Sequence, residues 1–210
     1  WMAMKNKGKL CIFEGVDGSG KSTQAKLLYE FLKEKGYKVF LTAEPYKRGL
    51  RDLIKEKFIS KKAKIKDGIL DSLLFTADRR MHIFDLEKQL KKNHVVICDR
   101  YYHSTFAYQH TQGVDMQWLI KLNDFALKPD LTLIFDISPS TALERVIKSK
   151  RKKIDKFERI NFLTELRKNY LKLPKLLKKE KIVIIDANKS PEIVFEETKK
   201  VVGRVLKLTI

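Results

Sequence analysis

The stretch CIFEGVDGSGKSTQAKLL, Cys11–Leu28, contains the residues on which the fold prediction depends. An apolar run ending in a glutamate leads into three glycines within six positions, and a lysine, two hydroxyl residues and a helical pattern follow. Gly15–Ser22 matches the whole G-x-x-x-x-G-K-[ST] motif, between a predicted strand and a predicted helix. Glycines let backbone N–H groups surround phosphate oxygens, and the helix adds its positive end. The stretch therefore predicts a phosphate-binding loop.

The motif also predicts which cofactors bind. Lys21 can reach the β- and γ-phosphates, and we expect its side chain to face solvent when no ligand is bound. Ser22 can ligate Mg²⁺. A GTPase needs a base-reading Asn-Lys-x-Asp, and the nearest string, Asn188-Lys189-Ser190, lacks the aspartate. We therefore expect ATP and Mg²⁺. The predicted ATP-binding residues of the loop are Gly15, Val16, Asp17, Gly18, Ser19, Gly20, Lys21, Ser22 and Thr23.

Five short apolar runs alternate with helical patterns along the chain. Near-continuous apolar runs are typical of parallel strands covered on both faces. The sequence thus predicts an α/β fold of the P-loop NTPase type, a five-stranded parallel sheet with helices on both faces. The predicted strands are KLCIFEG, KVFLTAEP, HVVICDR, DLTLIFDIS and KIVIIDAN. The predicted helices are 22–35, 67–92, 115–127, 138–149, 158–179 and 190–206.

Length and composition favour one globular domain. The chain has 210 residues, of which 43% are hydrophobic and 34% charged. We assign residues 4–210 to the domain and interpret Trp1-Met2-Ala3 as a vector remnant. No apolar run reaches the ~18 residues that a membrane helix needs. Cys11 and Cys98 lie in apolar runs, which predicts buried thiols and fits a cytoplasmic protein.

The net charge of +19 leaves two interpretations open. A polyanion such as nucleic acid is one possible partner of so basic a chain. The lysines are spread over many segments, however, without the interleaved aromatic residues that stack on bases. We favour a solvated lysine-rich surface and expect no nucleic-acid binding. The alternative is a basic P-loop ATPase that binds nucleic acid.

A second element, VVICDRYYHSTFAYQ, follows the third predicted strand. Asp99 ends an apolar run, where a carboxylate can order Mg²⁺ and its waters beside the glycine loop. Arg100 follows directly, and its fork of donors can hold a second phosphate. The pair predicts a second phosphate site next to the first.

Together these segments resemble thymidylate kinases. The resemblance rests on FEGVDGSGKSTQAKLL, LLFTADRRMH, VVICDRYYHSTFAYQ, KPDLTLIFDISPSTALERV and VIIDANKSPEIVFEE, from about Lys9 to Val205. Deoxynucleoside kinases share a similar glycine loop but usually have Glu-Arg-Ser at the second element. The resemblance implies a homodimer that transfers a phosphoryl group in line from ATP to dTMP. A kinase of another nucleoside monophosphate, such as dUMP, or of a deoxynucleoside is the alternative.

The resemblance also implies roles for individual residues. Asp17 would touch the acceptor's sugar hydroxyl, Phe75 would stack on thymine, Arg79 would read the base edge and Tyr108 would lie against the sugar. Arg145 would lie near the donor nucleotide. The implied catalytic residues are Asp17, Lys21, Asp99, Arg100 and Arg151, with Ser22 and Asp99 at the metal. The implied dTMP-binding residues are Asp17, Glu44, Pro45, Arg48, Phe75, Arg79, Arg100, Ser104, Thr105 and Tyr108.

Two features of the sequence, one of them a departure from the family pattern, affect these roles. Many bacterial relatives have Thr-Arg-Glu-Pro after the second strand, whereas this chain has Thr-Ala-Glu-Pro with Ala43 in place of the arginine. Arg48 and Arg51 follow and could replace it. The residue after Asp17 is the uncharged Gly18, so a basic lid at about 148–157 must supply the mobile charge. We expect Arg151 to do so, with Lys153 as the second candidate.

Overall fold

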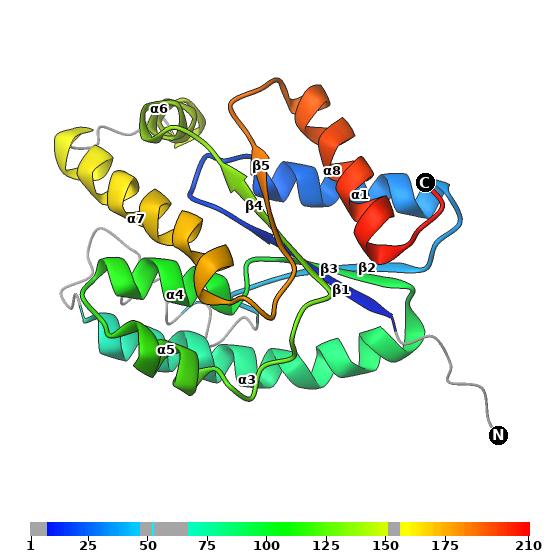
Figure 1. Cartoon of the computed structure of the whole chain (residues 1–210), viewed down its shortest axis with the longest axis horizontal. Helices are drawn as coiled ribbons and strands as arrows, with labels where there is room; N and C mark the ends of the chain where they lie inside the picture. Colours follow the sequence, from blue (N-terminus) through cyan, green and yellow to red (C-terminus); the bar gives the residue numbers. More distant parts are fainter. Residues whose placement is uncertain (1–7, 47–51, 53–66, 151–155) are drawn as a thin grey trace.

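A computed structural model describes residues 8–46, 52, 67–150 and 156–210 (Figure 1). Its centre is a five-stranded parallel sheet in the order β2-β3-β1-β4-β5. Each strand coincides with one of the five apolar runs, so the predicted α/β class and parallel sheet are confirmed. The strands are β1 (Lys9–Glu14), β2 (Val39–Ala43), β3 (Val95–Asp99), β4 (Leu131–Asp136) and β5 (Ile182–Asp186).

The strand order determines where a ligand can bind. β1 is the central strand, with β3 and β4 as its neighbours, and after β3 the chain crosses from one side of β1 to the other to form β4. In such sheets ligands bind beyond the carboxyl ends of the strands, at the point where the strand order reverses. Most side chains of the central strands are buried, and among them Cys11 and Cys98 are free thiols, as predicted.

Helices cover both faces of the sheet (Figure 1). One face carries two helices, α1 (Lys21–Glu34) and α8 (Pro191–Leu206). The other carries α3 (Gly68–Lys92), α4 (Tyr102–Thr111) and α7 (Lys156–Leu176). Against these pack α5 (Met116–Leu122), which contacts α4, and α6 (Pro139–Lys150), which contacts α7. No helix within the described segments is both long enough and apolar enough to cross a membrane.

Two helices differ from the prediction. α4 is absent from the helices that apolar periodicity predicts, because its sequence YHSTFAYQHT is rich in residues of low helix propensity. α5 ends at Leu122 and not at Leu127, since the side-chain amide of Asn123 donates to the Leu119 carbonyl oxygen at 2.9 Å and the chain turns there. Apolar periodicity reports neither the weak helix propensity of the α4 sequence nor the side-chain contact that ends α5.

Candidate active site

The glycine loop joins β1 to α1 in a backbone conformation that other residues disfavour. Gly15 and Gly18 have φ angles of 142° and 86°. A Cβ on Gly18 would lie 2.4 Å from the carbonyl oxygen of Ala142, and one on Gly15 would lie 2.7 Å from that of Phe135. Gly20 is the N-cap of α1 and gives it no side-chain cap, so the first N–H groups of the helix remain available. This geometry suits a bound phosphate.

Lys21 is buried, and the expectation that its side chain faces solvent is wrong. The residue is 5% exposed, and its Nζ lies 3.5 Å from the Val16 carbonyl oxygen and 4.0 Å from Asp17 Oδ1. The ammonium group therefore folds back over the loop. Burial, with the positive charge of Arg100 as the next cause, lowers the pKa of Lys21 to about 8. A phosphate in the loop would bring further negative charge to this ammonium group and favour its protonated form.

Ser22 and Asp99, the predicted magnesium ligands, occupy neighbouring parts of the sheet edge. Ser22 is exposed in the first turn of α1, while Asp99 ends β3 and is paired with Phe13 of β1. Asp99 Oδ1 is buried and has no hydrogen-bond partner in the described part of the chain. Hydroxyl, carboxylate and water oxygens are the ligands that Mg²⁺ prefers. These two residues therefore fit a magnesium ion whose other ligands are phosphate and water oxygens.

Arg100 is held against the acid of the glycine loop. Its backbone has a φ of 71° and donates to the Phe13 carbonyl oxygen at 2.9 Å. Nη2 donates to Asp17 Oδ1 at 2.6 Å, and the guanidinium carbon lies 5.3 Å from the centre of the Tyr108 ring. Nη1 donates to Ser104 Oγ at 3.1 Å. The guanidinium is thus directed at the glycine loop and is 19% exposed, so an anion can reach it.

The sequence analysis missed Glu14, which organises this corner of the site. The side chain is fully buried at the end of β1. Oε1 accepts from the backbone N–H groups of Tyr101 at 2.7 Å and Ser104 at 3.2 Å. Oε2 accepts from the Ser104 hydroxyl at 2.7 Å and the Tyr170 hydroxyl at 3.1 Å. Glu14 therefore caps α4 and ties it to α7. A glutamate inside an apolar strand run was the signal that could have revealed it.

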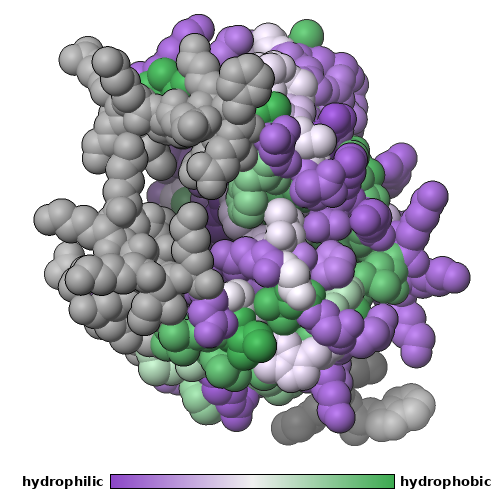
Figure 2. Space-filling model, turned by 90° about the vertical axis from the view of Figure 1, so that its left-hand side faces the viewer, coloured by the Kyte–Doolittle hydropathy of each residue, from purple (hydrophilic) through white to green (hydrophobic). Residues whose placement is uncertain are grey.

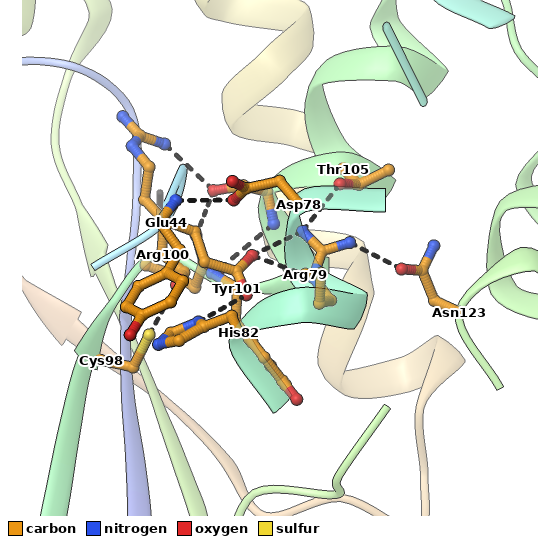
Figure 3. Close-up of polar contacts among 12 residues, drawn as sticks. Glu44, Asp78, Arg79, His82, Cys98, Arg100, Tyr101, Thr105 and Asn123 are labelled. Atoms are coloured by element: carbon orange, nitrogen blue, oxygen red, sulfur yellow. Dashed lines mark hydrogen bonds and ion pairs between the residues drawn. The ribbon is translucent and has the colours of Figure 1, made fainter. Parts of the chain in front are cut away.

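Arg79 is the centre of a second buried network (Figure 3). The residue is 1% exposed. Nε donates to Glu44 Oε2 at 2.9 Å, Nη1 to Asn123 Oδ1 at 2.6 Å and Nη2 to Thr105 Oγ1 at 3.2 Å. His82, one turn later on α3, has its Nδ1 3.1 Å from Glu44 Oε1. These contacts come from four segments and fix the guanidinium in one position.

A cavity of about 330 Å³ lies between the two networks. Every dTMP-binding residue predicted from the sequence lines it, except Arg48, which lies outside the described residues. Phe75 is half-buried one turn before Arg79 on α3, so its ring and the guanidinium share one wall. The predicted lining residues are Asp17, Glu44, Pro45, Phe75, Arg79, Arg100, Ser104, Thr105 and Tyr108. Six further lining residues were not predicted: Asp71, Tyr101, Gln109, Gln112, Phe162 and Leu163.

Arg145 lies on the other side of the glycine loop. Its Nη1 is 3.5 Å from the Gly18 carbonyl oxygen, and its Nη2 is 3.4 Å from that of Ala187. The arginine thus bridges the loop and the segment after β5, where the prediction places the donor nucleotide. Of the predicted lid, Arg151 and Lys153 lie outside the described residues.

The chain matches the family model for thymidylate kinase over residues 13–198. It is 37% identical over 199 residues to a "Probable thymidylate kinase" of Staphylothermus marinus, an alignment that covers 94% of this chain and 96% of the relative. A protein of the same name from Sulfurisphaera tokodaii is 40% identical, with 93% and 96% covered. The one from Sulfolobus acidocaldarius is 42% identical, with 90% and 94% covered. With a parallel sheet, a complete phosphate-binding motif and these matches over most of its length, the chain belongs to the thymidylate kinase family.

Proposed function

We propose that this protein transfers the γ-phosphoryl group of ATP to dTMP and forms dTDP and ADP. The observation that carries the proposal is the single cavity that extends from Asp17 in the glycine loop to Phe75 and Arg79 on α3. One end offers cationic groups beside a phosphate-binding loop, and the other offers an aromatic ring and a fixed donor. Such a cavity matches a nucleoside monophosphate in both its phosphate and its base.

The residues around the cavity have complementary roles in this proposal. Arg100 holds the acceptor phosphate, and Asp17 accepts from the sugar hydroxyl and orients the Arg100 fork. Phe75 stacks on the base, and Arg79 donates to a carbonyl oxygen of its edge. Tyr108 lies against the sugar, where its ring leaves no room for a ribose hydroxyl. Ser104 and Thr105 support this set, since their hydroxyls are bonded to Glu14 and Arg79.

The transfer requires little covalent chemistry from the protein. An acceptor phosphate oxygen forms a bond to the γ-phosphorus while the bond to the β–γ bridging oxygen breaks, and ADP leaves with that electron pair. Lys21 neutralises charge on the β- and γ-phosphates, and the N–H groups of the loop hold the donor in line. When bound, Mg²⁺ supplies further charge neutralisation and template geometry, held through Ser22 and through waters on Asp99.

A mobile cation at the transferring group completes the proposed mechanism. Gly18 follows Asp17 and has no charge, so the cation must come from elsewhere in the chain. We assign it to Arg151 in the lid at 148–157, because a planar guanidinium fits two phosphoryl oxygens. Arg151→Ala should lower kcat by about 10²-fold with little change in dTMP affinity. An unchanged kcat would indicate that Lys153 or Arg145 supplies the mobile cation instead.

One experiment tests the proposed function directly. ADP release is measured in a coupled assay with ATP, Mg²⁺ and a panel of acceptors: dTMP, dUMP, dCMP, thymidine and deoxycytidine. We expect the highest kcat/KM with dTMP. A preference for thymidine or deoxycytidine would make the protein a deoxynucleoside kinase, and equal rates without any acceptor would make it an ATPase.

A homodimer is part of the proposal, and α3 offers the interface. Ile69, Leu73, Met81 and Phe84 lie along one side of this helix and are between 39% and 56% exposed. Figure 2, which views the left-hand side of the molecule in Figure 1, shows hydrophobic residues toward the bottom of the view, at the level of α3 and α5 in Figure 1. A two-fold pair of such stripes would bury apolar surface between two strongly basic chains.

The dimer has a simple test. Phe84→Glu places two like charges at a self-complementary interface and should give a monomer in analytical ultracentrifugation. Ile193→Glu, on the exposed side of α8, is the matched control and should leave the dimer intact. A monomeric wild-type protein would contradict the assignment.

The nucleic-acid alternative has a test of its own. Binding that rests on net charge alone should weaken steeply as salt rises, whereas a nucleic-acid-dependent ATPase should bind DNA or RNA at physiological salt and hydrolyse ATP faster with it. We expect only the first behaviour.

We also place the protein in the cytoplasm, where its free thiols would stay reduced; recovery from another cell fraction would contradict this.

A further inference from the structure

Glu180 holds a buried polar cluster on a side of α4 that does not line the acceptor cavity, the cavity that extends from Asp17 to Arg79. It belongs to the turn between α7 and β5, and its side chain is 8% exposed. Oε1 accepts from the Tyr102 hydroxyl at 2.8 Å, and Oε2 lies 2.9 Å from His103 Nε2. Both partners are fully buried in the first turn of α4. The proposed mechanism gives none of the three residues a role, although buried polar groups are costly to desolvate.

The charges around Glu180 make it an acceptor for both partners. Burial raises the pKa of Glu180, but the hydrogen bonds from His103 and Tyr102 and the charge of Lys128 outweigh it, so the pKa is lowered. Lys128 Nζ lies 3.8 Å from Oε1 and 5.0 Å from the centre of the Tyr102 ring. The carboxylate is therefore ionised at neutral pH and can only accept. Because of this, His103 carries a hydrogen on Nε2, and both α4 side chains donate to Glu180.

The segment that Glu180 holds follows Arg100 directly. Arg100 has a φ of 71°, in the left-handed region, and a residue other than glycine is strained there unless its surroundings fix it. The Phe13 carbonyl oxygen holds the backbone N–H of Arg100 itself. Glu14 holds the next four residues through two of their backbone N–H groups, and Glu180 holds them through two of their side chains. Two carboxylates therefore maintain the strained conformation of Arg100.

We propose that Glu180 is a positioning residue for the acceptor phosphate, because it fixes the first turn of α4 and thereby the direction of the Arg100 guanidinium. Without Glu180 the turn can shift, and the fork that now reaches Asp17 and Ser104 leaves the position in which it binds a phosphate. The base end of the cavity and the glycine loop are built from other segments, so they keep their geometry. The inference rests on the proposed function, because Arg100 must bind the acceptor phosphate.

Glu180→Met is the test, since methionine has a similar length but accepts from neither partner. Calorimetry gives the Kd values for dTMP, thymidine and MgADP. The affinity for dTMP should fall about tenfold, while the affinities for thymidine, which has no phosphate, and for MgADP should stay within about twofold of the wild type. A merely structural role would lower the melting temperature without this selectivity. Glu196→Met is the matched control: this glutamate pairs with Lys199 at 2.8 Å on α8, and its loss should change none of the three affinities.

A second variant guards against a failure to fold. Tyr102→Phe removes one hydroxyl from the cluster without changing its packing and should weaken dTMP binding by about threefold. In an Arg100→Lys background neither Tyr102→Phe nor Glu180→Met should weaken it further, because both act through the fork.

Three outcomes would overturn the inference alone: an unchanged dTMP affinity in the variants, equal losses for dTMP and MgADP, or losses that add to that of Arg100→Lys. A wild-type protein that binds no dTMP would overturn the proposed function first.

Discussion

The glycine loop and the acceptor cavity meet at Asp17 and Arg100, but the chain builds them in different ways. Eight consecutive residues, Gly15–Ser22, form the loop, and their backbone provides the binding groups. The cavity draws its wall from the glycine loop, from the segments that follow β2 and β3, and from side chains of the helices α3, α4 and α7. A backbone site depends on local conformation, whereas a side-chain site depends on every partner of each buried charge.

The two regions should therefore respond differently to substitution. In the loop, one side chain, Lys21, carries most of the positive charge. Its removal should lower kcat and not the stability of the fold. Around the cavity, Arg79 in the wall and Glu14 behind it are buried charges whose partners hold several helices. Breaking one partner of a buried charged group is strongly destabilising. The predictions below test this contrast.

Lys21→Met should have the largest effect. Without the ammonium group at the β- and γ-phosphates, kcat should fall by about 10³-fold. The nucleotide-free protein should melt no lower than the wild type, since a buried ammonium group with a lowered pKa costs stability at neutral pH. Lys26→Met, an exposed lysine on the same helix, is the control. A lower melting temperature for Lys21→Met would show that the loop, too, depends on its side chains.

Glu14→Ala should act mainly on stability. Four donors lose their acceptor, and the free energy of unfolding should fall by about 3 kcal/mol in urea titrations. The KM for dTMP should rise more than that for ATP, because Ser104 and Arg100 lose their support. Glu30→Ala, on the exposed side of α1, should leave stability unchanged. A larger rise in the KM for ATP than in the KM for dTMP would show that Glu14 supports the glycine loop, which follows it in sequence, and not the acceptor cavity.

Arg100→Lys should have a smaller and more selective effect. The charge remains, but the fork that reaches Asp17 and Ser104 together is lost. The KM for dTMP should rise by roughly tenfold, with the KM for ATP within about twofold of the wild type. Arg80→Lys on the exposed side of α3 serves as the control. Equal increases for both substrates would mean that Arg100 supports the whole site and not the acceptor.

The difference between the glycine loop and the acceptor cavity also explains which parts of the structure could be predicted from the sequence. The sheet, its parallel direction and the loop were predictable because apolar runs and the glycine motif are contiguous signals. Family resemblance then named the cavity residues of α3 and α4. The helix α4 itself was not predictable from periodicity, since Glu14, at a separation of 87 residues from Tyr101, caps it. A cap supplied by another strand leaves no local pattern.

The burial and the contacts of individual side chains could not be predicted from the sequence either. Lys21 was expected to face solvent because a free lysine usually does, but its burial against the glycine loop depends on how the loop folds. The hydrogen-bonded set of Asp71, Gln112 and Gln109 was missed for a related reason. Its members are separated in sequence by 38 and 41 positions, counted from Gln109 and Gln112, and polar residues at such distances have no recognisable spacing. Networks of this kind become visible only when the helices that carry them are packed.

The smallest expected effect is a pH dependence of binding, which should be present for a ligand of the glycine loop and absent for a ligand of the acceptor cavity. In the folded, nucleotide-free protein the pKa of Lys21 is lowered from 10.5 to about 8, so between these values the unfolded chain binds more protons and stability rises with pH. Bound phosphates favour the ammonium form and raise the pKa again. Affinity for MgADP should therefore be constant below pH 8 and fall by up to about tenfold per pH unit above it, with proton uptake in calorimetry. Lys21→Met should abolish this proton uptake, whereas affinity for dTMP should lack the step near pH 8. A constant MgADP affinity up to pH 9.5 would show that the lysine stays protonated without its ligand.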